Sequence, residues 1–321
     1  MNLFIQNFLM KFRHLLLSIC LTFFTVHVVM ASPVDLRETY EEIENILLDN
    51  KYDTSIDIKS EELENMMRGD VYGVIYQPYK TVSKNLTSQI NWCEIMPQHL
   101  NIKACTYQYV NKQCRLTFYS GRKFYEKADN VYHLDYQFKV TTLKDDYFNV
   151  TLSSEEGPLD TTDYIISVEA IPLTDNSTFI HLSYEYKYGI WTRIAMSTYF
   201  STLGRKKVGF TISGEDKNQK PIYIKGIRGV IERNSMRYYF AIKSYLDTKT
   251  IPIETRFINK ISSWFDLTEK HHTQLYEMDK KDYLKYKKME RLDQNRLQKE
   301  INETSTTLDM ATSCIVNDIA P

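Results

Sequence analysis

The sequence lacks the short motifs that would assign an enzymatic function directly. It has no GxSxG elbow, no HExxH pair, no P-loop and no Rossmann glycine pattern, each of which places a catalytic or phosphate-binding group in a fixed local geometry. It also has no CxxC pair and no cluster of His and Cys, so we expect no metal site. No pattern in the chain indicates a cofactor.

An excess of charge of one sign is also missing. The 321 residues carry 40 Lys and Arg against 41 Asp and Glu, a net charge of −1. A nucleic-acid-binding protein normally shows a basic surplus, so we expect no nucleic-acid partner. Hydrophobic content of 43% and charged content of 25% are typical of a globular protein. The unusual number is 24 Tyr, a residue that suits half-buried strands and pockets with one polar end.

Long apolar runs are absent after residue 31, so no membrane span is expected in the mature chain. Before that point, basic residues between positions 11 and 14 precede the apolar run Leu15–Met30, and Ala31 ends a plausible cleavage sequence. The run of about 16 residues is short for a full span of about 20. Residues 1–31 therefore indicate a cleaved signal peptide and a periplasmic or secreted protein, with an uncleaved anchor as the alternative.

The cysteines of the mature chain are Cys93, Cys105, Cys114 and Cys314. An oxidising compartment permits disulfides. We expect the pair Cys93–Cys105, because these two residues flank a short connection that contains Pro97.

Hydrophobic periodicity predicts an early helix, two strands, a second helical stretch and then a long antiparallel meander. Strands 131–140 and 178–188 alternate apolar and polar residues, which indicates a sheet with one buried face and one wet face. On this pattern His133 and His181 are surface residues. The predicted helices are 35–50, 78–92, 189–204 and 224–247, and the predicted strands are 54–62, 69–77, 104–110, 114–120, 131–140, 147–152, 164–173, 178–188 and 207–213.

The helix 224–247 has an unusual apolar face. Asn234 falls near the centre of its apolar stripe, and Arg228 and Arg237 flank the stripe. Either the stripe is an ordinary core face with satisfied polar groups, or it closes over a ligand that needs polar contacts. Glu232 is expected to pair with Arg228, Arg193 or Arg205. The apolar stripe from Phe257 to Phe265 is expected to cover the rear of this helix, and a solvated, mixed-charge helix follows it.

This order of elements resembles the helix-grip fold of the START-like (SRPBCC) superfamily. The runs "NWCEIMPQHLNIKAC", "LSYEYKYGIWTRIAMSTYFSTLGRKKVGFTI" and "IKGIRGVIERNSMRYYFAIKSYLD" are similar to secreted bacterial proteins of that kind, and the resemblance covers Val71 to Phe265. It implies an α+β fold, in which a curved antiparallel sheet wraps a long C-terminal helix around a cavity that often holds an apolar ligand. The implied organisation is a signal peptide (1–31), a helix-grip domain (32–250), a helical extension (251–300) and a disordered tail (301–321).

The leading hypothesis is non-catalytic binding of an apolar or amphipathic, lipid-like small molecule. Asn234 and Arg237 would supply the polar contacts, and the other candidate lining residues are Ile231, Tyr238, Trp92, Trp191 and His99. One alternative is a cyclase- or hydratase-type enzyme, with His99 or a buried Tyr as the acid or base. Another is a scaffold with a packed cavity, whose interaction surface is the region from Phe257 onward. The sequence identifies no protein partner.

Overall fold

The computed structural model describes residues 32–48, 55–202 and 204–304. The chain divides into two units, Met1–Ser32 and Pro33–Pro321, and the second holds every helix and strand described below. The expected signal peptide at 1–31 and the expected tail from 305 onward lie outside the described residues. Residues 301–304 were expected to be disordered, but they form the last residues of helix α9 (Lys280–Thr304). The Thr304 hydroxyl donates to the carbonyl of Glu300 at 3.0 Å.

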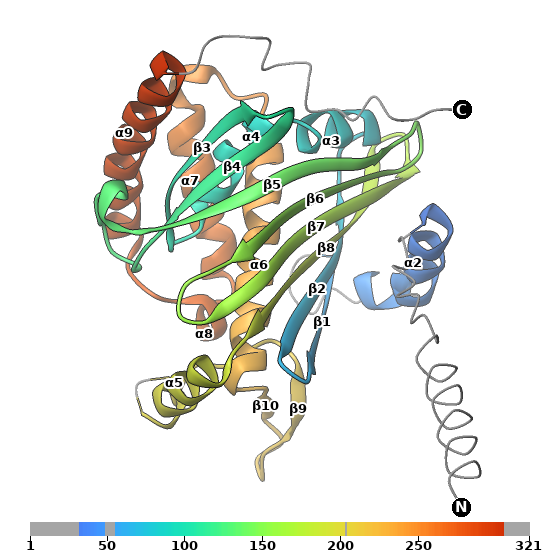
Figure 1. The fold of residues 1–321 in the computed structure, drawn as a ribbon. Coiled ribbons are helices and arrows are strands. Elements are labelled where there is room, and N and C mark those ends of the chain that lie inside the picture. Colours follow the sequence, from blue (N-terminus) through green and yellow to red (C-terminus); the bar gives the residue numbers. More distant parts are fainter. Residues whose placement is uncertain (1–31, 49–54, 203, 305–321) are drawn as a thin grey trace, which may run out of the picture. The chain divides into compact units, whose positions relative to one another are not determined.

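Eight strands form one antiparallel sheet in the order β1-β2-β8-β7-β6-β5-β4-β3. The sheet curves around the long helix α6 (Gly226–Asp247), as Figure 1 shows. This is the expected helix-grip arrangement, and that prediction is confirmed. The strands are β1 (Ile56–Leu63), β2 (Met66–Ile75), β3 (Ile102–Val110), β4 (Gln113–Ser120), β5 (Tyr132–Leu143), β6 (Phe148–Glu156), β7 (Thr161–Thr174) and β8 (Ser177–Tyr188).

The remaining elements join or cover the sheet. No helix within the described ranges combines the length and apolarity needed to cross a lipid bilayer. The strand expected at 207–213 is mostly absent, because residues 207–211 are irregular and only 212–213 belong to a strand, β9 (Ile212–Glu215). β9 pairs with β10 (Pro221–Tyr223) in a two-stranded hairpin apart from the main sheet. The helices are α2 (Pro33–Leu48), α3 (Tyr79–Leu86), α4 (Gln89–Ile95), η1 (Met96–Gln98), η2 (Ala128–Asn130), α5 (Ile190–Ser201), α7 (Ile253–Glu269), α8 (His272–Leu275) and α9 (Lys280–Thr304).

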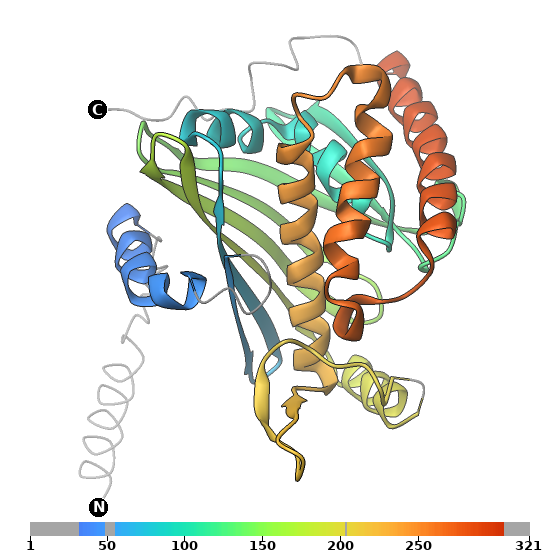
Figure 2. The same ribbon diagram turned by 180° about the vertical axis from the view of Figure 1, so that it is seen from behind.

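Helix α7 covers the rear of α6, as the apolar stripe predicted. Met236 and Phe240 on the rear of α6 are fully buried, and the indole N–H of Trp264 donates to the carbonyl of Arg237 at 3.0 Å. Figure 2 shows α6, α7 and α9 together on one side of the sheet. The sheet therefore carries two helical layers at this point, and α6 lies between the sheet and α7.

Helix α9 is not solvated all round, which corrects the expectation from its charge. Lys287 and Glu290 on its inner face are 4% and 2% exposed, and Glu290 bridges the ammonium groups of Lys287 (2.7 Å) and Lys103 (2.9 Å). Two glutamines of α9 also bond the edge strand β3: Gln294 accepts from the backbone N–H of Cys105, and Gln298 bonds both backbone groups of Tyr107. An unpaired strand edge invites association with other chains, and α9 covers this one.

The disulfide Cys93–Cys105 is present and ties α4 to β3, as expected. The expected pairing of Glu232 is wrong. Its fully buried carboxylate accepts from the Ser60 hydroxyl at 2.6 Å and from the backbone N–H groups of Phe210 (2.5 Å) and Thr211 (3.0 Å). Charge-assisted hydrogen bonds replace the expected ion pair, and they hold the segment after α5 against α6.

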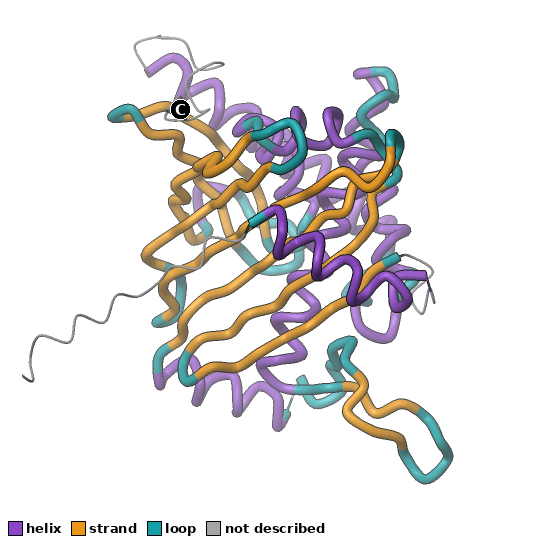
Figure 3. The backbone as a smooth tube through the Cα atoms, turned by 90° about the vertical axis from the view of Figure 1, so that its right-hand side faces the viewer, coloured by secondary structure: helices purple, strands orange, loops and turns teal. Residues whose placement is uncertain are grey.

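The outer face of the sheet is partly covered by α2 (Figure 3). Beside it lies His181, which was expected at the surface but is only 8% exposed. Its two ring nitrogens each lie 2.8 Å from a carboxylate, that of Glu169 on β7 and that of Asp70 on β2. Burial acts to lower the pKa of His181, but hydrogen bonds to Asp70 and Glu169 outweigh it and raise the pKa. The alternation of apolar and polar residues along the strand could not predict this cluster. The pattern shows which face of the sheet a side chain lies on, but not whether other residues cover that face.

Candidate functional site

The close approach of α6 to the sheet depends on two glycines of β2. Gly69 and Gly73 are four residues apart and so lie on the same face of the strand. A Cβ on Gly69 would meet the Ser235 hydroxyl at 2.5 Å, and a Cβ on Gly73 would meet the Tyr239 hydroxyl at 2.2 Å. β2 therefore has no side chains at the two positions where α6 crosses it. The resulting contact between the β2 backbone and α6 fixes the position of α6 over the inner face of the sheet.

Tyrosines line the inner face near the middle of α6. Tyr184 on β8 meets Tyr238 of α6 edge-on, with ring centroids 5.1 Å apart. The tyrosines at this end keep 3–8% exposure, whereas Ile180 and Leu182 earlier on β8 are fully buried. Along β8, the side chains are therefore less completely buried toward the end that leads into α5. The tyrosines in question are Tyr136, Tyr164, Tyr184, Tyr186 and Tyr238, and we call this set the tyrosine end.

His99 lies beside the tyrosine end and is neutral. It is 3% exposed, and its ring is 4.9 Å from that of Tyr238. Burial lowers the pKa of His99 well below its usual value, and the charges of Arg237 and Lys287 add to the effect. Its Nδ1 accepts a hydrogen bond from the backbone N–H of Asn101 at 3.1 Å, so the proton of the neutral ring is on Nε2. The side chain of Asn234 acts as a hydrogen-bond partner that opposes the lowering of the pKa, but no contact with good hydrogen-bond geometry reaches Nε2 from the described residues.

Arg237 is the second polar group at this end. It is 4% exposed and forms an ion pair with Glu277 at 3.1 Å, while Nη1 approaches the Asn234 amide oxygen at 3.5 Å. Its Nε–H is buried and has no partner within the described ranges. The site thus contains two buried hydrogen-bond donors without partners among the described residues, His99 Nε2 and Arg237 Nε. Each such donor lowers the stability of the folded state by about 1–3 kcal/mol.

Glu277 concentrates positive charge near these donors. Besides Arg237, it pairs with Lys123 at 2.5 Å and with Lys207 at 2.7 Å. Burial acts to raise the pKa of Glu277, but the charges of Arg237 and Lys123 and the hydrogen bonds from Lys123 and Lys207 lower it to about 2. Three cations therefore surround one carboxylate, and the local field favours a ligand group with negative or partial negative charge.

These groups can hold an acceptor but are poorly suited to move a proton. The His99 nitrogen that could act as a base already accepts a hydrogen bond, and its other nitrogen carries the proton. Burial raises the pKa of Tyr184 and Tyr238, so their hydroxyls stay protonated. Across the described ranges, no group of His, Cys, Asp and Glu is arranged to hold a metal ion.

The structure brings together four of the seven residues predicted to contact a ligand: His99, Asn234, Arg237 and Tyr238. The other three lie elsewhere. Ile231 is fully buried against Gly69, and Trp92 is fully buried with its N–H donated to the carbonyl of Leu86, so both are core residues. Trp191 is 72% exposed on α5 and lines no interior surface.

Sequence reasoning missed Glu277, Lys123 and Lys207. Glu277 lies in the connection before α9, within a segment whose mixed charge indicated solvent. Lys123 and Lys207 lie in connections far apart in the sequence. Only the packing of the connection before α9 against α6 brings the three together with Arg237, and no local pattern predicts that contact.

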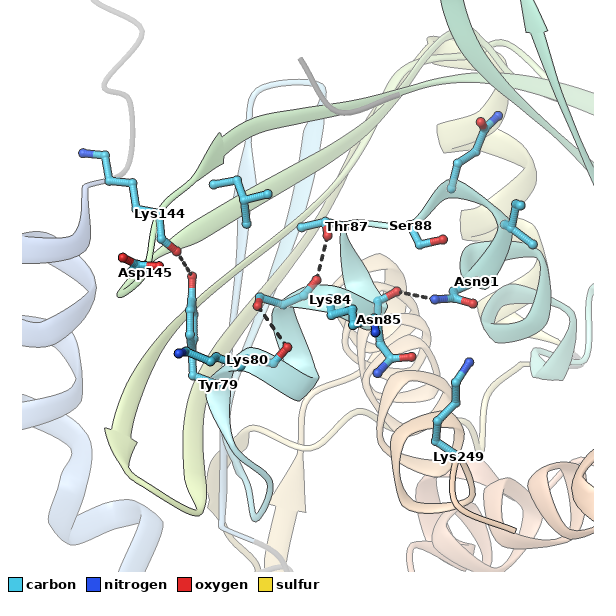
Figure 4. A pocket seen from close by; sticks show the side chains of 14 residues that line it. Tyr79, Lys80, Lys84, Asn85, Thr87, Ser88, Asn91, Lys144, Asp145 and Lys249 are labelled. Carbon is cyan, nitrogen blue, oxygen red and sulfur yellow. Dashed lines mark hydrogen bonds between the residues drawn. The ribbon is translucent and has the colours of Figure 1, made fainter. Parts of the chain in front are cut away.

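A separate hollow lies at the opposite end of α6 (Figure 4). It is an open groove of about 890 Å³ along α3, α4 and the β5–β6 connection. Lys80, Lys84 and Lys144 line it and are exposed, so solvent screens their charges. Lys249 is half-buried and donates to the Tyr245 hydroxyl at 2.5 Å. Tyr79 is the aromatic side chain among its lining residues, and none of them carries a buried donor without a partner, which makes the groove a weaker candidate for the function.

No protein-family model matches the chain, and no sequence of a characterised protein matches it. Solved structures with a related arrangement include human StAR-related lipid transfer protein 5, at 10% identity and TM-score 0.33, covering 68% of this chain and 99% of that one. The Zhui aromatase/cyclase from a Streptomyces species is similar at 8% identity and TM-score 0.31, covering 64% and 94%. A protein of unknown function from Enterococcus faecalis is similar at 12% identity and TM-score 0.33, covering 70% and 95%. Likeness at this level does not transfer a ligand or an activity to this chain.

Proposed function

We propose that this protein binds an amphipathic small molecule between the tyrosine end of the sheet and α6. The apolar body would lie against the tyrosines, and a carbonyl or carboxylate would accept hydrogen bonds from His99 and Arg237. The observation that carries the proposal is the pair of buried donors, His99 Nε2 and Arg237 Nε, which lack partners among the described residues. A ligand acceptor would remove their desolvation cost, which makes binding favourable at this point.

The proposal requires movement, because both donors are sealed from solvent in this conformation. Access is expected from the α5 side, where the tyrosines keep 3–8% exposure. We place the protein in the periplasm or outside the cell, supported by the signal-peptide pattern of residues 1–31. The disulfide Cys93–Cys105 is compatible with an oxidising compartment.

A head-group series tests the proposal. A saturated fatty acid, the alcohol of equal length and the corresponding alkane share one apolar body and differ in acceptor strength. The chain from Ser32 onward should bind the acid and the alcohol better than the alkane. Arg237→Met should reduce the preference for the acid by about tenfold. Glu277 would keep Lys123 and Lys207 as partners in this variant, so folding should survive.

Lys299→Met provides a matched control, because Lys299 lies 77% exposed on α9, away from the site. Its affinities for all three ligands should equal those of the unmodified chain. Equal binding of acid and alkane, or no binding of any member of the series, would contradict the proposal.

A further inference from the structure

Helix α5 presents an uncovered apolar face. Ile190, Trp191 and Ile194 are 67%, 72% and 52% exposed, and their spacing places them on one side of the helix. Large apolar side chains that gather on one exposed face mark an interaction site rather than the scatter normal for a protein surface. Trp191 is the informative member, because the other two tryptophans, Trp92 and Trp264, are 0% and 1% exposed.

The β9–β10 hairpin is the second uncovered apolar element at this end. Ile212 and Ile222 are 51% and 43% exposed, and all four residues of β9 are exposed. An isolated two-stranded hairpin is marginally stable in water. Figures 1 and 2 show α5 and the hairpin on either side of the first turns of α6, projecting beyond the end of the sheet. Two apolar elements therefore lie at one end of the fold.

This end is also basic. Residues 190–225 contain seven Lys and Arg and two acidic residues, in a chain whose net charge is −1. Two of the seven have partners: Arg193 bonds the carbonyl of Glu64, and Lys207 pairs with Glu277. The other five are exposed, and they are Arg205, Lys206, Lys217, Lys220 and Lys225.

We propose that this end docks on an anionic lipid surface, with α5 lying in the interface. An exposed Trp suits the level of the lipid headgroups, and neighbouring Ile side chains suit the region just below them. The exposed basic residues then contact lipid phosphates, each contributing about 1 kcal/mol. A second copy of the chain is the less favourable occupant, since a two-fold interface would bring two equal basic surfaces together.

The docking end adjoins the end of β8 at which the buried side chains keep some exposure. Strand β8 carries Tyr184 and Tyr186 and then runs directly into α5. A membrane-docked chain would thus present its tyrosine end to the bilayer. The docking proposal does not depend on the binding proposal, because it rests on exposure and charge at the surface alone.

Tryptophan fluorescence provides the test. The chain from Ser32 onward, which contains the whole unit Pro33–Pro321, is mixed with vesicles of phosphatidylcholine, with or without phosphatidylglycerol. With the anionic lipid, emission should shift to shorter wavelength and the protein should sediment with the vesicles. Pure phosphatidylcholine should give neither result, and added salt should weaken binding. Because Trp92 and Trp264 are buried, the shift reports Trp191.

Variants separate the two contributions. Trp191→Ser should weaken co-sedimentation by at least about tenfold, while Leu292→Ser, at a site that is 71% exposed on α9, should leave it unchanged. Lys217→Ser and Lys220→Ser should each weaken binding about fivefold, and Lys299→Ser should not. Circular dichroism of each variant checks that the fold is retained.

Absence of binding to anionic vesicles would overturn the proposal, as would full binding by folded Trp191→Ser. A concentration-dependent dimer that Trp191→Ser abolishes, with no vesicle binding, would assign this end to self-association instead. The head-group series of acid, alcohol and alkane, measured in vesicle-free solution, is a separate readout, so either proposal can fail while the other stands.

Discussion

At the scale of single residues, the chemistry of the interior depends on which nitrogen of His99 carries the proton. The backbone N–H of Asn101 occupies Nδ1 and burial keeps the ring neutral, so Nε2 is a donor aimed into the protein. Arg237 adds a second such donor. The sequence indicated a polar group on the apolar face of α6, but the tautomer follows only from the fold of residues 99–101.

Glu232 makes a direct prediction for stability. Its carboxylate accepts from Ser60, Phe210 and Thr211, so Glu232→Gln would replace one acceptor with a donor that faces other donors. The free energy of unfolding should fall by about 1–3 kcal/mol, measured by urea denaturation. Glu215→Gln, at an exposed position on β9, should change it little. Equal stabilities for the two variants would contradict the role assigned to Glu232.

His181 makes a prediction for pH dependence. Its pKa is raised in the folded state, so its stabilising contribution is complete below the unfolded value of about 6.5 and declines as pH rises through the folded pKa. Urea denaturation from about pH 6 to pH 9 should show this decline. His181→Gln should be about 3–5 kcal/mol less stable at the acidic end, and its disadvantage should shrink toward the alkaline end. A constant difference across the range would contradict the linkage.

Asp70 acts in the opposite direction at low pH. Burial acts to raise its pKa, but hydrogen bonds from His181 and Arg68 lower it to about 2. A lowered folded pKa gives stability that is present above about pH 4 and is lost as pH falls toward 2. Asp70→Asn should therefore flatten the acid limb of the stability profile, as followed by circular dichroism. An unchanged acid limb in this variant would contradict the assignment of acid sensitivity to Asp70.

At the scale of elements, most of the fold followed from periodicity. The alternation of strand residues predicted every strand of the main sheet, because burial of one face imposes a period of two. The strand expected at 207–213 was misplaced, because β9 begins only at Ile212, and β10 was not predicted. The buried face of α9 was missed because it contains Lys287 and Glu290, whose mutual pairing satisfies their charges.

The contact of α6 with β2 gives a test at this scale. Gly73→Ala should destabilise the protein by about 1–3 kcal/mol, because the new Cβ would lie 2.2 Å from the hydroxyl of Tyr239, a side chain that is 1% exposed and cannot move aside. Gly214→Ala is the matched control, since nothing lies within 4 Å of its added Cβ. Thermal denaturation of both variants decides the matter, and equal melting temperatures would show that α6 can withdraw from β2.

The glutamines of α9 that bond β3 give a second test at the scale of elements. Gln294→Ala with Gln298→Ala should expose the backbone of β3, because these side chains bond Cys105 and Tyr107. We expect a loss of about 1–3 kcal/mol and more association in light scattering. Lys299→Ala on the exposed side of α9 should show neither effect. A monomeric, fully stable double variant would mean that β3 needs no cover.

At the scale of the whole molecule, the sheet, its inner helix and the C-terminal helices belong to one unit, Pro33–Pro321. Glu277, from the connection before α9, reaches Arg237 on α6, so the C-terminal region completes the candidate site. The sequence could predict the aromatic sheet face and four of the contact residues. It could not predict the cationic surroundings, because Glu277 meets Arg237, Lys207 and Lys123 across separations of 40, 70 and 154 residues.

The measurement that tests the central claim most directly is native mass spectrometry of the chain from Ser32 onward, secreted by its host and purified without detergent. The account predicts a discrete added mass that is lost on denaturation and belongs to a molecule with an apolar body and a carbonyl or carboxylate. Asn234→Leu should reduce that occupancy more than it reduces stability, and Lys299→Met should change neither. A bare mass in every preparation, from a folded chain with the Cys93–Cys105 bond intact, would contradict the account and favour a packed interior.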